Sequence, residues 1–449
     1  MRGLSSLPLD DDVVDRILTF LPNYSTLQAT ILASKAFHNV FKMYPTATIR
    51  AVSYNVVGPA LPQAISVLRY SLPDSDSDGQ TNLSMTPPPR PWEETDPVSP
   101  ISNEECRALQ RNAQVVNTLE DLFSSRHKDR ASQTSILHSM ESWRFRRAVY
   151  RLMLFAKAFP PDEYEDDFDS DEPPDANELL RVRVQRKKLL AKFTNSELRE
   201  VNSVAIFLIE VAKWAHIADG LHYDGALGSG DLPLARGPTM ILEAYQNKYV
   251  EDLVGECHDD QMPSMLAEYI FDPLSRIWRE RNEKPPPSDT THWNSILDTI
   301  HGGADMCHRC NVVRGFDLWN ESNWGYLEGV STSLNRNAIP QLVKGNFISN
   351  VLDGPNFRTR VMNVAYTKLL NEIYQVKTSA YDTWNKQDWL CEACIIEIIR
   401  SHLHLWYLER KRENGEQIPE DCWYGYDCRT QTHSMHHAAR VNHLCAPTR

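Results

Sequence analysis

CEACIIEIIRSHLHLWYLERKRENG, residues 391–415, joins a cysteine pair to a strongly periodic helical segment. The basic residues at 410–412 fall in the last predicted turn, where positive charge favours the helix dipole, and Gly415 follows at the position of a C-terminal cap. We therefore predict a long helix that starts at the cysteine pair and ends near Gly415. The residues that recur at helical spacing are Ile395, Ile398, Ile399, His402 and Leu405.

The motif CxxC occurs twice, at Cys307–Cys310 and at Cys391–Cys394. One pair alone is compatible with redox chemistry, but that chemistry needs a βαβ setting, and neither pair follows a convincing buried strand. Two pairs together supply the four thiolates of a closed tetrahedral zinc site. We expect the four cysteines to share one zinc, with His308 able to replace one thiolate. The alternative interpretation is two pairs of free thiols in a reducing compartment.

The stretch DCWYGYDCRTQTHSMHHAARVNHLC at 421–445 contains three cysteines and four histidines. So short and polar a segment buries too little apolar area to fold without a metal, and thiolate and imidazole are the ligands that zinc takes. We therefore predict a second zinc site. Its predicted ligands are Cys422, Cys428, His437 and either His443 or Cys445.

This segment, and CWYGYDCR in particular, resembles the PBZ zinc finger, a small poly(ADP-ribose)-binding module. In that family two cysteines enclose an aromatic–glycine pair and two histidines follow; here the interval before the first histidine ligand is longer. The resemblance implies that Tyr424 stacks on an adenine, that Arg429 contacts a phosphate, and that Gly425 lets a ligand approach the backbone. The alternative is a purely structural site in which Tyr424 packs against Trp406 or Trp423.

The N-terminal residues 7–45 read LPLDDDVVDRILTFLPNYSTLQATILASKAFHNVFKMYP and predict three short helices. An apolar stripe marks the first helix, Pro22 ends it, and Ser34 precedes the third. The Leu-Pro opening, the Ile-Leu pair and the Ser-Lys-x-Phe ending resemble an F-box, and the final Tyr-Pro is typical of fungal versions. The one departure is a slightly stretched interval between Pro8 and Val13.

An F-box is a compact helical unit whose apolar face binds the Skp-family adaptor of a cullin-based ubiquitin ligase. The resemblance therefore implies these two partners. The alternative is a set of helices that only packs against the rest of the chain. The residues that the resemblance places on the adaptor-binding surface are Leu7, Pro8, Ile17 and Leu18.

The composition indicates a globular protein, with 449 residues, 41% apolar and 24% charged. A net charge of −13 opposes general nucleic-acid binding. The most apolar stretch, 204–215, is interrupted by Glu210 and Lys213, so we expect a core helix and no membrane partner. The N-terminus lacks an apolar signal core, and most of the cysteines have ligand spacing, which favours the cytoplasm or the nucleus.

Catalysis is not expected from this sequence. It contains no GxSxG, Walker or HExxH motif, and Cys257-His258 is the only adjacent cysteine–histidine pair outside the predicted metal sites. Residues adjacent in sequence do not face each other on a helix, so this pair is a poor nucleophile and base. We therefore expect a binding protein and no enzyme.

These signals predict a mainly α protein with four parts. They are an F-box-like unit at 1–50, a Pro/Ser/Asp-rich linker or loop at 73–100, a large irregular helical body at 101–415 that carries the CxxC pairs, and a PBZ-like finger at 416–449. The expected function is an adaptor that brings an unidentified substrate protein to a cullin-type ligase. The alternative is a nuclear protein that binds poly(ADP-ribose) or a related nucleotide polymer.

Overall fold

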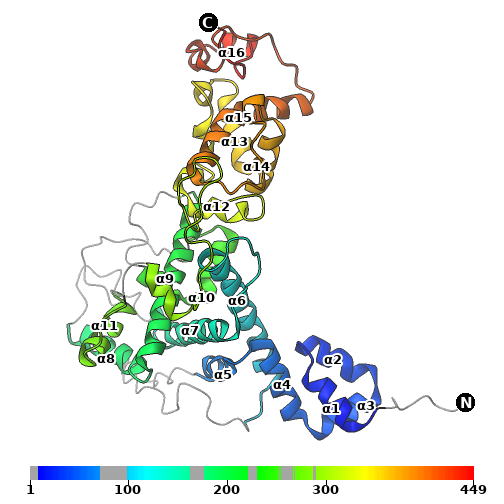
Figure 1. Ribbon diagram of the computed structural model, residues 1–449, viewed down its shortest axis with the longest axis vertical. Helices are drawn as coiled ribbons and strands as arrows, with labels where there is room; N and C mark the ends of the chain where they lie inside the picture. Colours follow the sequence, from blue (N-terminus) through cyan, green and yellow to red (C-terminus); the bar gives the residue numbers. More distant parts are fainter. Residues whose placement is uncertain are drawn as a thin grey trace, which may run out of the picture.

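The computed structural model describes residues 9–70, 99–161, 176–220, 230–251, 268–286 and 290–448, together with residues 253 and 266. The predicted mainly α fold is confirmed, since the described chain is built from α-helices with short 3₁₀ turns and three isolated β-bridges. Three groups of helices follow one another in space, from the N-terminal unit through a middle body to a C-terminal column (Figure 1). Each group has its own apolar core.

The N-terminal unit consists of four helices around a small core. Local capping fixes two of them, because the Asn23 side chain accepts a hydrogen bond from the Thr26 amide at 2.8 Å and Ser34 Oγ accepts one from the Ala36 amide at 3.2 Å. Leu7 and Pro8 lie outside the described residues. The helices are α1 (Asp11–Thr19), α2 (Tyr24–Ala33), α3 (Lys35–Met43) and α4 (Pro45–Val57).

The middle body is a bundle of longer helices around the largest core. Its central helix, α9 (Asn195–Ala218), packs against α7 and α10. Among the described helices α9 alone is long and apolar enough to cross a membrane, but its side chains are mostly buried within the protein, as expected for a core helix. The other helices are α5 (Leu61–Arg69), α6 (Asn103–His127), α7 (Ser139–Ala158), α8 (Ala176–Leu190), α10 (Asp231–Asn247) and α11 (Phe271–Glu280).

The C-terminal column has shorter helices separated by irregular segments. The predicted helix at 391–415 is observed as α15 (Glu392–Glu413), and its apolar face fills the core of the column. The expected boundary between 101–415 and 416–449 is not a boundary between cores, because Leu444 is buried in the same core as α15. The other helices are α12 (Trp324–Val330), α13 (Gly354–Asn363), α14 (Tyr366–Gln375) and α16 (Met435–Arg440).

The column meets the middle body through α12. Trp324 and Leu327 belong to the core of the column, whereas Tyr326 and Val330 pack against the core of the middle body. A Cβ at Gly329 would lie only 2.7 Å from the Trp214 carbonyl oxygen, so glycine is required where α12 meets α9. Nearly all of the predicted linker at 73–100 lies outside the described residues.

Candidate metal centres

The two CxxC pairs come together in the column. Their four Sγ atoms lie within 4.8 Å of one another, with Cys307 3.7 Å from Cys394 and Cys310 3.7 Å from Cys391. Four sulfur ligands around a tetrahedral ion at about 2.3 Å lie about 3.8 Å apart. The four cysteines can therefore hold one metal ion. Only Cys310 is exposed.

Two β-bridges position these thiols. Met306 bridges Val313 and closes the first CxxC loop, while Trp319 and Leu390 exchange two backbone hydrogen bonds of 2.9 Å. Cys391 is the N-cap of α15, so Cys394 lies in the first helical turn. The loop of the first CxxC pair is thus held against the N-terminal end of α15.

His308 is not a ligand. Its Nδ1 accepts a hydrogen bond from the Trp389 amide at 3.2 Å, and half of its side chain is exposed. The alternative in which His308 replaces a thiolate is therefore corrected by the structure. The imidazole instead strengthens the contact between the two cysteine segments, because the His308 amide also donates to the Trp389 carbonyl at 2.8 Å.

The thiols of this centre differ in acidity. Burial raises the pKa of Cys307, but hydrogen bonds from the amides of Cys310, Cys391 and Arg309 outweigh it and lower the pKa to about 7. Burial raises the pKa of Cys391 and of Cys394, and the neighbouring thiols raise both further. Several thiolates in one buried site repel each other. A bound cation removes that penalty, so this donor set fits a metal ion.

The first centre is also attached to the middle body, through Arg130 just beyond α6. Arg130 Nη1 donates to the Gly315 carbonyl at 3.1 Å, and the same guanidinium pairs with Asp305. It lies 4.6 Å from the centroid of the Trp389 ring, which precedes the second cysteine pair. No sequence pattern predicts this contact, since its partners are 175 or more residues apart.

The second centre contains Cys422, Cys428, His437 and His443, whose ligand atoms also lie within 4.8 Å of one another. His437 Nε2 lies 3.8 Å from Cys422 Sγ and 3.4 Å from Cys428 Sγ. Sulfur and nitrogen ligands of one tetrahedral zinc lie about 3.6 Å apart. His443 Nε2 is buried and has no hydrogen-bond partner among the described residues. An ion at this position would satisfy that nitrogen.

Local structure aims each ligand of the second centre. The Cys422 amide donates to the Asn442 carbonyl at 2.9 Å beside the bridge between Asp421 and Asn442, which places Cys422 next to His443. Ser434 caps α16 through the His437 amide at 3.3 Å. Burial, with a smaller contribution from His437, lowers the pKa of His443 to about 4. His443 is therefore neutral at pH 7, as a metal ligand must be.

Cys445 is not part of this centre. Its Sγ donates to the carbonyls of Cys422 and Asn442, each at 3.4 Å. Burial, with a smaller contribution from Asp421, raises the pKa of Cys445 to about 11, so the thiol stays protonated and can donate. The structure resolves the choice of fourth ligand in favour of His443, and the prediction of Cys445 as a ligand is corrected.

The surroundings of Gly425 differ from what the PBZ resemblance implies. A Cβ at Gly425 would lie 2.2 Å from the Cys445 carbonyl oxygen, and Gly425 has a φ of +45°. The backbone of residues 445–447 fills the space beside Gly425, so no ligand can approach the backbone there. Tyr424 is 52% exposed and does not pack against Trp406, which is buried and donates to Glu372 at 2.8 Å. Arg429 is exposed as well.

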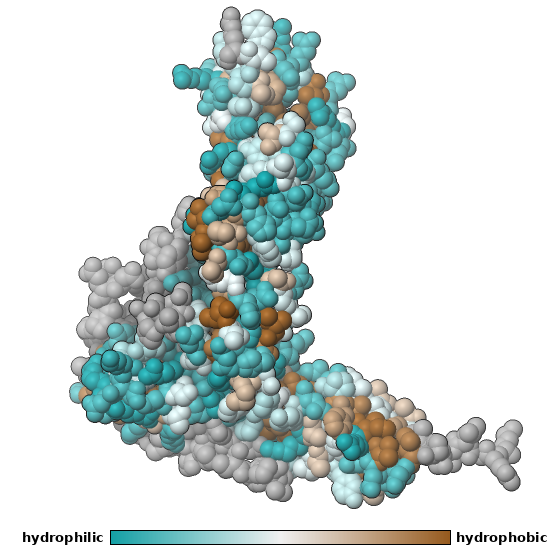
Figure 2. All heavy atoms as spheres, in the orientation of Figure 1, coloured by the Kyte–Doolittle hydropathy of each residue, from teal (hydrophilic) through white to brown (hydrophobic). Residues whose placement is uncertain are grey.

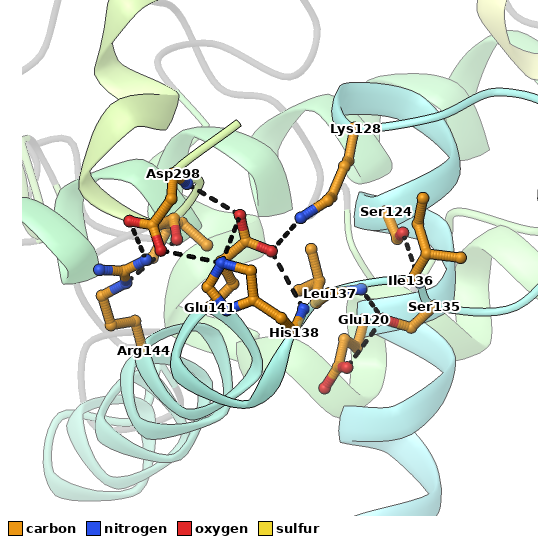
Figure 3. A network of polar contacts seen from close by, with 11 residues as sticks. Glu120, Ser124, Lys128, Ser135, Ile136, Leu137, His138, Glu141, Arg144 and Asp298 are labelled. Carbon is orange, nitrogen blue, oxygen red and sulfur yellow. Dashed lines mark hydrogen bonds and ion pairs between the residues drawn. The ribbon is translucent and has the colours of Figure 1, made fainter. Parts of the chain in front are cut away.

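A third cluster, His138, Glu141 and Asp298, is an ion-pair network. The buried Glu141 pairs with Lys128 and accepts amide hydrogen bonds from His138 at 3.1 Å and Asp298 at 2.8 Å. Asp298 pairs with Arg144 at 2.7 Å (Figure 3). Burial raises the pKa of Glu141, but Lys128 and the amides lower it more. Because cations and amides already satisfy both carboxylates, the cluster ties α7 to the segment near 298.

Of the predicted partner-binding residues, Ile17 and Leu18 lie on different sides of α1. Leu18 is fully buried in the core of the unit, so it is not on a surface, and that prediction is corrected. Ile17 is 36% exposed and lies in an apolar area with Val13 and Phe20, which are 45% and 71% exposed. Apolar residues gather on the N-terminal unit in the space-filling view (Figure 2). Periodicity alone did not separate the two faces.

Comparison with known protein families, with curated proteins and with solved structures found no match for this chain. The geometry of the two metal centres and of the exposed face of α1 therefore carries the functional argument.

Proposed function

We propose that both clusters hold zinc and that the two ions are structural. Ligand chemistry supports zinc: one centre offers four thiolates, and the other offers two thiolates and two imidazoles. Neither centre offers the oxygen ligands that magnesium or calcium needs. Each centre has four protein ligands, so no coordination position is left for a substrate. The test is elemental analysis of protein purified without chelator. Two zinc ions per chain are expected, and a folded sample without zinc contradicts the proposal.

The N-terminal unit serves as an adaptor module that binds a Skp-family subunit of a cullin-type ubiquitin ligase. In this function the chain is not an enzyme, and the middle body and column select an unidentified substrate protein. The proposal extends the F-box pattern of the sequence to the exposed residues of α1.

One observation carries this proposal: α1 is apolar on two faces. Val14 and Leu18 are fully buried in the core of the unit, whereas Val13, Ile17 and Phe20 remain exposed. The exposed residues line a shallow hollow of about 370 Å³. A helix whose second face is also apolar needs a second partner, because soluble surfaces rarely leave such a patch uncovered.

The experiment is co-purification of the Skp-family adaptor and cullin with wild type and with Ile17→Glu/Phe20→Glu. Truncating or charging a central apolar anchor costs on the order of 2 kcal/mol or more, so recovery should fall at least tenfold. Met140→Glu is the matched control, since Met140 is 52% exposed but lies on α7 of the middle body. Equal recovery with all three proteins, or none with any, contradicts the adaptor function.

The second candidate function is poly(ADP-ribose) binding by the finger. Exposed Trp423 and Tyr424, at 66% and 52%, lie near the exposed Arg429, which is the side-chain chemistry that stacks on bases and pairs with phosphates. A filter-binding titration at physiological salt should show affinity for the polymer that Tyr424→Ala weakens while zinc content stays constant. Absence of binding by wild type rejects this function and leaves the adaptor function untouched.

A further inference from the structure

A cavity of about 450 Å³ lies between α15 and the segment that carries the second metal centre. It is of the size that accommodates a small metabolite. Helix α15 contributes His404, Leu405, Leu408 and Arg412, and the finger contributes Asp421, Tyr426 and residues 444–446. The Asp421 carboxylate already accepts a hydrogen bond from Asn442 Nδ2 at 2.7 Å. Lys344 enters from the irregular segment before α13. The cavity therefore exists only when the finger is folded against α15.

His404 is the first sign of a ligand. The residue is only 4% exposed, yet Nδ1 has no hydrogen-bond partner among the described residues. Leaving a buried nitrogen unsatisfied costs about 1–3 kcal/mol, so a hydrogen-bond partner from outside the chain, such as a water molecule or a ligand, would stabilise the ring. The other contact of the ring is the edge of Tyr426, with the ring centroids 5.3 Å apart. That contact fixes the orientation of the imidazole at the cavity wall.

Lys344 is the second sign, and it is independent of the first. It is half-buried, and the ion pairs among the described residues do not include it. Its ammonium group lies 5.5 Å from the centroid of the Tyr426 ring, the ring that also contacts His404. Burial, with a smaller contribution from Lys344, lowers the pKa of His404 to about 4, which places the two groups in one electrostatic environment.

We propose that this cavity binds a small ligand with one anionic group, which Lys344 pairs with and His404 hydrogen-bonds, while its apolar part rests on Leu405 and Leu408. A phosphate monoester and a carboxylate share this chemistry. The neutral His404 imidazole can donate one N–H to such an oxygen. The ammonium adds a charge-assisted bond in a partly dehydrated site. The proposal goes beyond the adaptor and polymer-binding functions and depends on neither.

The experiment uses the full-length, zinc-loaded chain and three small probes. Phenyl phosphate and benzoate carry the two anionic groups on the same ring, and benzyl alcohol is the uncharged control. Isothermal titration should show saturable binding of at least one anionic probe, and benzyl alcohol should bind at least tenfold more weakly. The stronger of the two anions identifies the anionic group.

Two variants locate the binding. Lys344→Gln should weaken the affinity for the anionic probe at least tenfold. Lys368 is a 63% exposed lysine outside the cavity, so Lys368→Gln should leave the affinity unchanged. In the NMR spectrum of the imidazoles, the His404 signal, assigned with His404→Gln, should shift on titration while the His138 signal stays in place. Binding unchanged in Lys344→Gln, or no saturable binding of either anion up to about 10 mM, overturns the proposal.

Discussion

The middle body and the C-terminal column solve the same folding problem in different ways. The middle body buries long helices, some of them closed by capping boxes such as Ser102 with Glu105, and its buried charges are paired. Apart from α15, the column has shorter helices joined by irregular segments, and both of its metal centres lie where those segments cross. Metal ligands therefore replace apolar area where helices are too short to bury enough of it.

Removal of one thiolate from the first centre gives the largest expected difference between the two regions. Cys391→Ser should lose one zinc per chain and destabilise the column by about 4 kcal/mol or more, because loss of a structural metal is among the most severe single-residue effects. Hydrogen exchange measured by mass spectrometry should show faster exchange at 305–319 and 390–413, with the middle body still protected.

The matched control for that experiment is Cys106→Ser in the middle body. Cys106 is buried but belongs to the apolar core and not to a metal cluster. It should keep both zinc ions and leave the column protected. Equal loss of protection in both halves of Cys391→Ser would show that the column and the middle body unfold as one unit.

The second comparison lies within the finger, between Cys428 and Cys445. Cys428→Ser should release the second zinc and expose residues 421–445 to proteolysis. Cys445→Ser should keep the metal and cost less than about 1 kcal/mol, because a serine hydroxyl can still donate to the two carbonyls that the thiol reaches. Zinc content and limited proteolysis, measured for both variants, check this prediction. Loss of zinc in Cys445→Ser would reverse the assignment of His443 as the fourth ligand.

Low pH should remove the stability that paired charges contribute to the middle body. Burial raises the pKa of Glu197, but Arg151 and the cap at Thr194 outweigh it and lower the pKa from 4.5 to about 2. A depressed folded-state pKa contributes stability above pH 4.5 that is lost as the pH falls towards 2. Glu197→Gln should therefore cost on the order of 2 kcal/mol at pH 7, and this difference should shrink between pH 4.5 and 2.

Urea unfolding at several pH values measures that effect, and Glu283→Gln is its control. The Glu283 pair with Arg199 spans 3.2 Å, but both side chains are more than one-third exposed, so its loss should be close to neutral. A cost for Glu197→Gln that does not change with pH would assign its effect to packing rather than charge.

The smallest effect is expected at the exposed surface of the finger. Tyr424→Ala and Arg429→Ala should change the free energy of unfolding by no more than about 0.5 kcal/mol, because neither side chain is buried. Both variants should retain two zinc ions. A clear loss of stability in Tyr424→Ala would mean that this ring packs in solution and would weaken the case for a polymer-binding surface.

The fold class, the long helix from the second CxxC pair, and three of the four ligands of the second metal centre could be predicted from the sequence alone. These follow from local patterns: helical periodicity is set by residues a few positions apart, and CxxC spacing places two thiols on one turn. The Ser34 cap and the end of α1 before Pro22 are local in the same sense.

Contacts between distant segments, and the choice between the alternatives that the sequence left open, follow from the three-dimensional packing. Cys307 and Cys391 lie 84 residues apart, and the Trp319–Leu390 bridge that joins them has no signature in either segment. His443 and Cys445 are equally suitable ligands in a linear sequence, but the Asp421–Asn442 bridge turns the imidazole inward and the thiol towards backbone carbonyls. The burial of Leu18 and the cavity beside His404 likewise depend on neighbours from distant segments. Such contacts come from packing, which local propensity does not encode.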